Sequence, residues 1–281
     1  MFLKGLLWYL AAKSGSKLQR LERIVSNRGI GSRNEVAKLL KAGRIEVDGD
    51  VITSGSKRFN SEITVYVDGE AIPPIPLLAI YHKPIGIHSV MKDPWGRDTI
   101  SELSLEYPYM KSLHPVGRLD ADTSGLLLFS RDGHLTQTLL SPKNAIEREY
   151  EAIVVGEVNK NELENKLKNG IETTEGTFAA NLLEVTILDD KVPFNVEYDE
   201  EGKIMKTTTQ AIEMVIASRI ILTVSEGKYR MVRRVLHNSG HSVIELKRLR
   251  YGEIILNEED LEGDVRIATD IERDWAESLM S

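Results

Sequence analysis

His114-Pro-Val-Gly-Arg-Leu-Asp120-Ala-Asp-Thr-Ser-Gly125-Leu-Leu-Leu-Phe-Ser-Arg-Asp-Gly133 is the stretch around which the rest of the chain is arranged. It places one acid, Asp120, after a Gly-Arg pair and before a small polar loop. The apolar run 125–130 is short and continuous, which favours a buried strand over a surface helix. We therefore expect Asp120 on a loop held by rigid structure, where functional side chains are often found. The alternative is an ordinary turn residue that bonds its own backbone.

Composition narrows the classes of function. At 281 residues the chain can bury a substantial core, and the lack of cysteine excludes thiol nucleophiles, disulfides and Cys-type zinc sites. The net charge of −7 hides a segregation of charge. Residues 13–58 carry eleven Lys and Arg against five Asp and Glu, and residues 226–250 carry seven against two. Two basic segments on an otherwise acidic chain are typical of specific binding to a polyanion.

The N-terminal segment has its own character. Residues 1–21 contain no acid, and Leu6-Leu-Trp-Tyr-Leu10 is an apolar group flanked by lysines. This group is too short to span a membrane, so residues 1–17 are expected to be a flexible extension or the remnant of a targeting segment. We find no other candidate for a membrane segment. A cytoplasmic location is expected, with import into an organelle as the alternative.

Residues 18–72 have the pattern of a small domain. An amphipathic helix begins near Leu18, and Ser32 and Glu35 form a capping box that opens a second helix ending at Gly43. A hairpin turn at Asp48-Gly49 joins two short strands, and a further strand covers 63–67. Four basic residues gather near the second helix and predict one basic face, although each alone is also typical of a solvated helix surface: Arg33, Lys38, Lys41 and Arg44. The proline-rich residues 73–76 predict a stiff linker, followed by a second domain over 77–281.

Two further segments of the second domain carry candidate functional residues. Residues 146–155 alternate as a strand that contains Tyr150, and a strand tyrosine is most often a packing residue. Residues 230–238 predict a helix on which Arg230, Arg233 and Arg234 share one face, and such a cluster repels itself unless an anion is present. His237 and His241 do not predict a metal site, because Gly240 separates them and no acid accompanies them.

The central motif resembles the signature of the pseudouridine synthases that modify ribosomal RNA, and within them the RsuA/RluB group. The match lies in Gly117-Arg-Leu-Asp120, with His-Pro-Val before it and Thr-Ser-Gly-Leu-Leu-Leu after it. His82-Lys-Pro-Ile-Gly86 is similar to the entry motif of that family, with His82 in place of the usual Asn. Residues 18–70 resemble the small RNA-binding domain named after a small-subunit ribosomal protein, which these enzymes often carry at the N-terminus.

The resemblance implies a role for each matching residue. Asp120 takes the place of the catalytic carboxylate, Tyr150 that of the residue packing against the target base, and Arg233 that of the basic partner of the catalytic acid. Met231 departs from the usual Gln of that third motif. Arg118 is the candidate wedge that fills the stack when the uridine flips out. RNA contacts are expected from Arg118, Lys228, Arg230 and Arg234, with Arg33, Lys38, Lys41 and Arg44 on the small domain.

The sequence therefore predicts an α+β protein: a small α/β RNA-binding domain followed by a pseudouridine synthase domain with a mixed, largely antiparallel sheet. We expect isomerisation of uridine to pseudouridine in ribosomal RNA or a pre-ribosomal particle, by a monomer, with no cofactor, metal or membrane. Asp120 would act ionised, as nucleophile or as base, with Arg233 keeping its pKa from rising. A non-catalytic assembly factor and a hydrolase using Asp120 and Asp122 are the alternatives.

The choice of ribosomal subunit rests on weaker signals. Ser141-Pro142 and Ser225-Glu-Gly-Lys-Tyr229 favour small-subunit RNA, whereas Ile146-Glu-Arg-Glu-Tyr150 favours large-subunit RNA. We expect the small subunit by a narrow margin.

Overall fold

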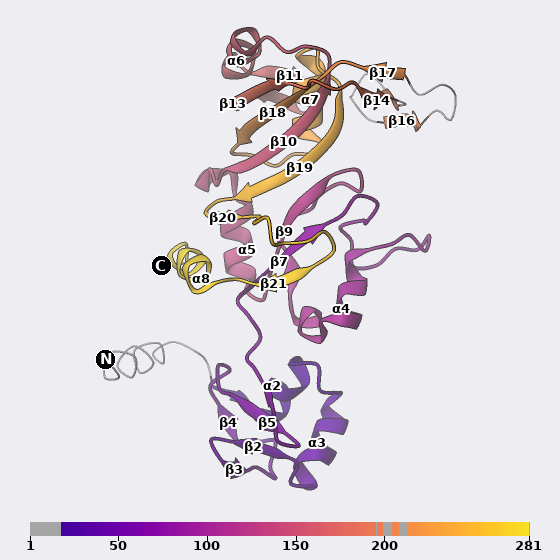
Figure 1. Ribbon diagram of the computed structural model, residues 1–281. Coiled ribbons are helices and arrows are strands. Elements are labelled where there is room, and N and C mark those ends of the chain that lie inside the picture. Colours follow the sequence, from indigo (N-terminus) through magenta and orange to yellow (C-terminus); the bar gives the residue numbers. More distant parts are fainter. Residues whose placement is uncertain (1–17, 195, 199–203, 208–212, 281) are drawn as a thin grey trace. The chain divides into compact units, whose positions relative to one another are not determined.

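The computed structural model describes residues 18–280 except 195, 199–203 and 208–212 (Figure 1). The expected N-terminal segment 1–17 lies outside the described residues. The chain divides into two compact units, one comprising Met1–Leu77 with Glu102–His114 and the other Leu78–Ser101 with Pro115–Ser281. Residues 102–114, which we had expected in the second domain, are thus assigned to the first unit by their contacts, while the domain boundary at 73–76 stays a prediction. None of the described helices is long and apolar enough to cross a membrane.

The first unit contains short helices and a small sheet. The sheet order is β3-β2-β5-β6, and β1 pairs separately with β4. Its elements are β1 (Gln19–Arg20), α2 (Leu21–Asn27), α3 (Arg33–Lys41), β2 (Ile45–Val47), β3 (Asp50–Val51), β4 (Arg58–Phe59), β5 (Val65–Val67), β6 (Glu70–Ile72), α4 (Leu103–Glu106) and η2 (Pro108–Ser112). The 3-10 helix η1 (Ile100–Glu102) has its first two residues in the second unit.

Local signals in the sequence explain this unit. The predicted capping box is present: the Ser32 hydroxyl accepts from the Glu35 amide, and the Glu35 carboxylate accepts from the Ser32 amide. Buried Leu21, Ile24 and Val25 on α2 pack with Val36 and other apolar residues to form the core. Helix α3 begins where the capping box predicts. The expected start of the first helix near Leu18 is wrong, because Gln19 and Arg20 pair with β4 as strand β1 and α2 begins at Leu21. Both helices pack by their apolar stripes.

The second unit is built on a mixed sheet with the order β13-β18-β10-β19-β9-β7-β21. Every pairing along this path is antiparallel except that of β19 with β9, which confirms the predicted α+β class with a largely antiparallel sheet. The strands are β7 (Leu78–Lys83), β8 (His114–Pro115), β9 (Ser124–Ser130), β10 (Arg148–Val155), β13 (Asn181–Ile187), β18 (Ala217–Val224), β19 (Val243–Tyr251), β20 (Ile254–Ile255) and β21 (Val265–Ile267).

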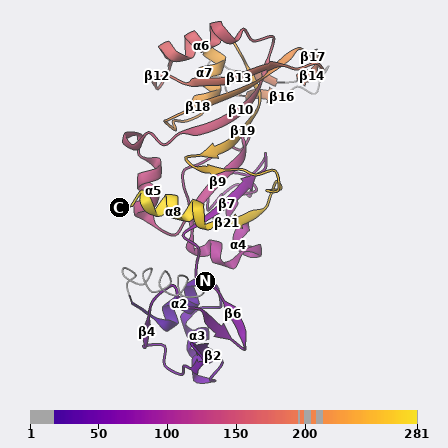
Figure 2. The same cartoon turned by 60° about the vertical axis from the view of Figure 1, so that its left-hand side comes forward.

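Helices and short hairpins complete this unit. Figures 1 and 2 show α6 and α7 together near the β13 end of the sheet, with α5 beside β9. These elements are α5 (Gly133–Leu140), η3 (Pro142–Asn144), α6 (Lys160–Asn169), β11 (Ile171–Thr173), β12 (Gly176–Phe178), β14 (Val192–Phe194), β15 (Val196–Tyr198), β16 (Ile204–Thr207), β17 (Glu213–Val215), α7 (Met231–Asn238) and α8 (Asp270–Ser278).

The parallel contact of β9 with β19 lies directly behind the central motif. All residues of β9 are buried, as the apolar run predicted. Gly125 has φ +103°, and a Cβ there would lie 2.3 Å from the Arg248 carbonyl oxygen. Only glycine allows the two backbones to approach this closely. Residues 247–250, at the end of the second basic segment, lie within β19.

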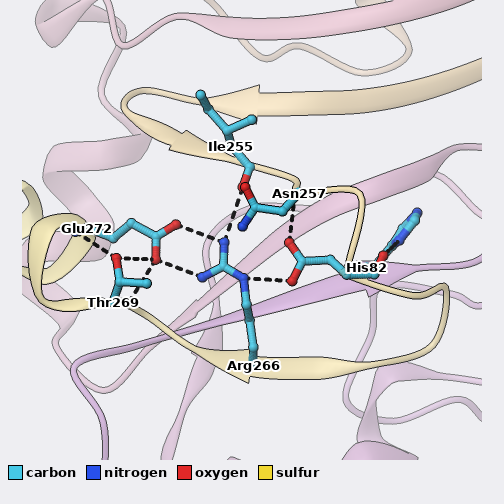
Figure 3. Close-up of polar contacts among 7 residues, drawn as sticks. His82, Ile255, Asn257, Arg266, Thr269 and Glu272 are labelled. Carbon is cyan, nitrogen blue, oxygen red and sulfur yellow. Dashed lines mark hydrogen bonds and ion pairs between the residues drawn. The ribbon is translucent and has the colours of Figure 1, made fainter.

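The C-terminal residues contribute a strand to the main sheet, because β21 pairs with β7 at its edge. Arg266 on β21 holds this region together (Figure 3): it donates to Asp260 Oδ1 at 2.8 Å, to both Glu272 oxygens at 2.7 and 2.8 Å, and to the Ile255 carbonyl. Glu272 also completes a capping box with Thr269 at the start of α8. A three-residue strand is too short to predict from the alternation of apolar and polar residues. Its position depends on the tertiary structure, in which it pairs with β7 at the edge of the sheet.

Candidate active site

A pocket of about 220 Å³ opens where the central motif meets β10, β19 and the segment before α7. This volume suits one nucleoside-sized group better than a large ligand. Residues from distant parts of the chain line it: Val116, Gly117, Arg118, Leu119, Asp120, Thr123, Leu140, Arg148, Tyr150, Glu226, Gly227, Lys228, Tyr229, Arg230, Met231, Val232, Leu246, Arg248 and Tyr251.

Backbone hydrogen bonds fix the loop that carries Asp120. The Thr123 amide donates to the Asp120 carbonyl at 3.1 Å, and the Gly86 amide donates to the Ala121 carbonyl at 2.7 Å. The hydroxyl of buried Ser89 donates to the Leu119 carbonyl at 2.6 Å. The loop after β7 therefore holds the motif from one side, and the expectation of a rigidly supported acid is met in this geometry.

The two acids of the motif have different surroundings. Asp122 accepts two hydrogen bonds from Arg230, at 2.9 and 2.7 Å, and its Oδ2 lies 3.4 Å from Arg233 Nε. Among the described residues Asp120 accepts no side-chain hydrogen bond, and its nearest cation is Arg230 at 3.7 Å. Asp122 is thus committed to holding two arginines, whereas the Asp120 carboxylate lies at the pocket with its oxygens available to a substrate.

The pKa values of these two acids shift in opposite directions. Desolvation raises the pKa of Asp120 above 3.8, and the charge of Asp122 adds to the rise, while Arg230 and Arg233 oppose it. Desolvation also acts on Asp122, but the Arg230 hydrogen bonds and the two arginine charges outweigh it and lower the pKa. The expectation that a basic partner would keep the pKa of Asp120 from rising is therefore wrong. The arginines are directed mainly at the neighbouring acid.

A buried lysine lies behind the motif. Lys83, the last residue of β7, is fully buried and donates to the Pro84 and Ile87 carbonyls, both at 2.8 Å. Desolvation lowers its pKa to about 8, opposed by the charges of Asp122 and Asp120. No solvent-exposed surface remains on this side chain, so Lys83 cannot serve as a surface contact for phosphate.

The arginine helix differs from the expected surface face. Helix α7 begins at Met231, and Arg230 precedes it in the left-handed region, with φ +50°. Arg233 and Arg234 are 1% and 5% exposed. Arg234 lies 3.2 Å from Glu175 and stacks over the Tyr229 ring. The anions that the cluster requires are therefore acids of the same chain. The expectation of an exposed arginine that contacts RNA is wrong for Arg234, which is buried and paired with Glu175.

The other expected site residues fall in two places. Asp120, Tyr150, Arg118, Lys228 and Arg230 all line the pocket. Tyr150 on β10 is nearly buried, whereas Arg118 and Lys228 are exposed at the pocket. The four basic residues of the first unit are exposed on or near α3: Arg33, Lys38, Lys41 and Arg44. The Arg44 guanidinium donates two hydrogen bonds to the Asp68 carboxylate.

Sequence reasoning missed part of the pocket. Arg148 and Arg248 are buried in its wall, and both guanidinium groups lie over the Tyr251 ring. In the sequence, Arg148 stands two residues before Tyr150 in the predicted strand 146–155, and Arg248 belongs to the basic segment 226–250, so neither residue stands out from its neighbours. The sequence feature that points to Arg248 is Gly125. A glycine at this position allows the backbones of β9 and β19 to approach closely, which brings Arg248 next to the central motif.

Comparison with known proteins gives two family matches. The family described as RNA pseudouridylate synthase matches residues 78–238, and the S4 domain matches residues 19–62. "Ribosomal large subunit pseudouridine synthase B" of Bacillus subtilis (strain 168) is 32% identical over 254 residues, covering 90% of this chain and 93% of that protein. The protein of the same name from Vibrio vulnificus (strain CMCP6) is 33% identical, covering 85% of this chain and 68% of that one.

A solved structure shows the same similarity in three dimensions. The structure titled "Crystal structure of pseudouridylate synthase" aligns with a TM-score of 0.53 and 26% sequence identity, covering 92% of this chain and 99% of that chain.

Proposed function

Because the chain belongs to the RNA pseudouridylate synthase family and carries an S4 domain, we propose that this pseudouridine synthase isomerises a specific uridine of ribosomal RNA, with Asp120 as the catalytic carboxylate. The observation that carries the assignment of the acid is the contrast with Asp122. Asp122 is held by Arg230 and Arg233, while the Asp120 carboxylate lines the pocket and accepts no side-chain hydrogen bond among the described residues.

The remaining pocket residues have proposed roles that follow from their chemistry. Tyr150 offers an aromatic face to a flipped base, and exposed Arg118 can stack in the gap that the base leaves. Lys228 and the exposed basic residues near α3 supply contacts to phosphates. Asp120 either bonds to the anomeric carbon of the ribose or removes a proton from the sugar, and the charge of Arg230 opposes the rise that burial causes in the pKa of this carboxylate.

The subunit of the target RNA is a finer proposal. The names of the Bacillus and Vibrio relatives support large-subunit RNA. The segments Ser141-Pro142 and Ser225-Glu-Gly-Lys-Tyr229 are the reason for retaining the small-subunit expectation as the second candidate. We favour the large subunit, because those relatives match over most of the chain rather than in short segments.

The test is carbodiimide-stop primer extension on large- and small-subunit ribosomal RNA transcripts and on partly assembled particles. We expect one new stop with the wild type, none with Asp120→Ala, and an unchanged stop with Asp98→Ala, which removes an exposed acid outside the pocket. The position of the stop identifies the subunit. Residual turnover in Asp120→Ala would overturn the role of that acid, and no stop on any RNA despite tight binding would point to an assembly factor.

A further inference from the structure

Two arginines in the pocket wall share one aromatic ring. The Arg148 guanidinium lies 4.7 Å from the centre of the Tyr251 ring, and the Arg248 guanidinium lies 5.2 Å from it. Arg148 and Arg248 are 4% and 3% exposed, and Tyr251 is 1% exposed. Two positive charges are thus held close together in the buried wall of the pocket that Asp120 also lines.

The hydrogen bonds of this pair involve only uncharged partners. Arg148 donates to the Leu139 carbonyl at 3.1 Å, the Ser225 carbonyl at 3.3 Å and the Tyr251 hydroxyl at 2.7 Å. Arg248 Nε donates to the Leu126 carbonyl at 2.7 Å. Over the part of the chain that the structure describes, neither guanidinium has a carboxylate within 4 Å. Carbonyls orient these groups but leave their charge in place.

Unmet hydrogen-bonding groups gather in the same wall. Arg248 Nη2, Arg230 Nε and Thr123 Oγ1 are buried and make no hydrogen bond in the described structure. All three residues line the pocket. Buried polar groups are nearly always paired in a folded protein, so a cluster of unmet ones beside a pocket indicates a place for ligand acceptors.

The proposed reaction creates an anion in this pocket whichever route Asp120 takes. When the bond between N1 and the anomeric carbon breaks, its electron pair stays with the base, which becomes a uracil anion with charge on N1 and the two carbonyl oxygens. The sugar carbon is satisfied by a bond to Asp120 or by loss of its neighbouring C2′ proton to Asp120. The base then turns, C5 bonds to the sugar carbon with release of Asp120 or return of the proton, and the C5 proton is lost while N1 is protonated.

We infer that Arg148 and Arg248 form an electrostatic seat for the uracil anion that exists between cleavage of its bond to the sugar and formation of the new one. This inference rests on the proposed function. Preorganised positive charge in a water-poor site stabilises charge that develops in the transition state more than it stabilises the neutral substrate. The seat also holds the detached base in the pocket while it turns.

A phosphate group fits this place less well than the base does. Arg118 and Lys228 are the exposed cations of the pocket, and they suit the backbone, which stays in water. Arg148 and Arg248 lie inside the wall beside Tyr150, whose position in β10 faces Arg248 in the strand register. The weakly hydrated, planar guanidinium is suited to a planar anion with charge spread over several atoms.

The test compares two substrates in single-turnover reactions: an RNA transcript containing the mapped uridine, and the same transcript made with 5-fluorouridine. Loss of the N1-linked nucleoside is followed by nuclease digestion and mass spectrometry. Fluorine at C5 withdraws electrons and stabilises the departing anion without the protein. A residue that stabilises the anion therefore matters less for the fluorinated RNA, whereas a residue that only supports the fold matters equally for both.

We expect Arg248→Met to slow uridine cleavage about 100-fold, the scale of losing one preorganised donor, and to slow 5-fluorouridine cleavage by less than about 10-fold. Arg248→Lys, which keeps the charge, should retain more activity, and Arg148→Lys provides a second, milder test of the pair. Arg250→Met is the matched control on the same strand, because its guanidinium is paired with Glu147 and Glu149, and it should leave both rates unchanged.

The outcomes separate the two proposals. If the wild type forms pseudouridine but Arg248→Met has the same defect on both RNAs, or none, the anion seat is overturned and the proposed function stands. If the wild type itself forms no pseudouridine on any transcript or particle, the proposed function fails and the anion seat fails with it. Thermal unfolding followed by circular dichroism confirms that each variant compared is folded at the assay temperature.

Discussion

Arg266 and the pair Arg148 and Arg248 show two ways of burying a guanidinium in the same unit. Arg266 donates to Asp260 and Glu272, whose side chains are each 12% exposed (Figure 3). The pocket pair has only carbonyls and a hydroxyl as acceptors. A buried charge without a counter-ion costs several kcal/mol. A charge that stabilises a reaction intermediate can justify this cost, whereas a charge that only supports the fold cannot. The unpaired Arg148 and Arg248 therefore indicate the active site, and the paired Arg266 indicates a structural role.

Breaking the paired arginine should produce the largest loss of stability. Arg266→Met leaves Asp260 and Glu272 without their cation, and we expect a loss of about 3 kcal/mol in the free energy of unfolding, at the lower end for a buried pair because Arg266 is partly exposed. Urea unfolding of the full chain measures it. Turnover by the folded fraction should be unchanged, because Arg266 lies outside the pocket. A variant as stable as the wild type would show that the comparison is wrong.

The same loss has a predicted pH dependence. Burial raises the pKa of Glu272, but the hydrogen bonds from Arg266 and Thr269 outweigh it and leave the pKa below 4.5. A lowered pKa in the folded state stabilises the protein above the ordinary glutamate value and ceases to do so as the pH falls through the folded value. The difference between wild type and Arg266→Met should therefore shrink below pH 4.5.

Removing the charge of Asp122 should leave two further arginines, Arg230 and Arg233, without their acid, and so tests the contrast between paired and unpaired arginines. Asp122→Asn removes the charge that holds Arg230 and Arg233, and we expect a loss of about 2 kcal/mol in stability. Asp122 also raises the pKa of Asp120, so its removal should lower that pKa. Turnover requires the ionised carboxylate of Asp120. As the pH is lowered, the kcat/KM of the wild type should therefore fall at a pH above the pKa of an ordinary aspartate. That acid limb should move to lower pH in Asp122→Asn. An unmoved limb would mean that another group controls it.

The N-terminal cap of α8, in which Thr269 bonds the same Glu272 that pairs with Arg266, should contribute less to the free energy of unfolding. The Thr269 hydroxyl accepts from the Glu272 amide and donates to the Glu272 carboxylate. Thr269→Ala should cost about 1 kcal/mol, the usual value for losing an N-cap. A melting curve measures the change, with Ser278→Ala at the other end of α8 as the control. If the loss from Thr269→Ala persists undiminished in the Arg266→Met background, the cap and the ion pairs act independently.

The smallest effect on stability is expected at the pocket. Arg248→Met leaves no carboxylate behind and replaces an unpaired charge by an apolar side chain of similar length, so the free energy of unfolding should change by less than about 1 kcal/mol. Urea unfolding beside Arg266→Met makes the comparison direct. A loss as large as that of Arg266→Met would mean that Arg248 is itself a scaffold residue.

Much of the scaffold followed from local patterns. The Ser32 capping box, the buried run of β9 and the alternation of β10 predicted elements that the structure contains, because each depends on neighbours in the chain. The pocket was predicted in part. Asp120 and Tyr150 were found through motifs, while the burial of Arg233 and Arg234 was not, because their acids, Asp122 and Glu175, come from distant segments.

The sequence by itself determined the family, the α+β class and the stretch that carries the candidate acid, since these reside in short-range order and in a dense motif. Only the tertiary structure decided which charges are satisfied. It pairs Asp122 with Arg230 and Arg233. It buries Asp120, which raises the pKa of that carboxyl group. It places Arg148 and Arg248 over the Tyr251 ring, without an acid beside them among the described residues. Charge and desolvation act through space, so they depend on which strands meet and not on the order of residues along the chain.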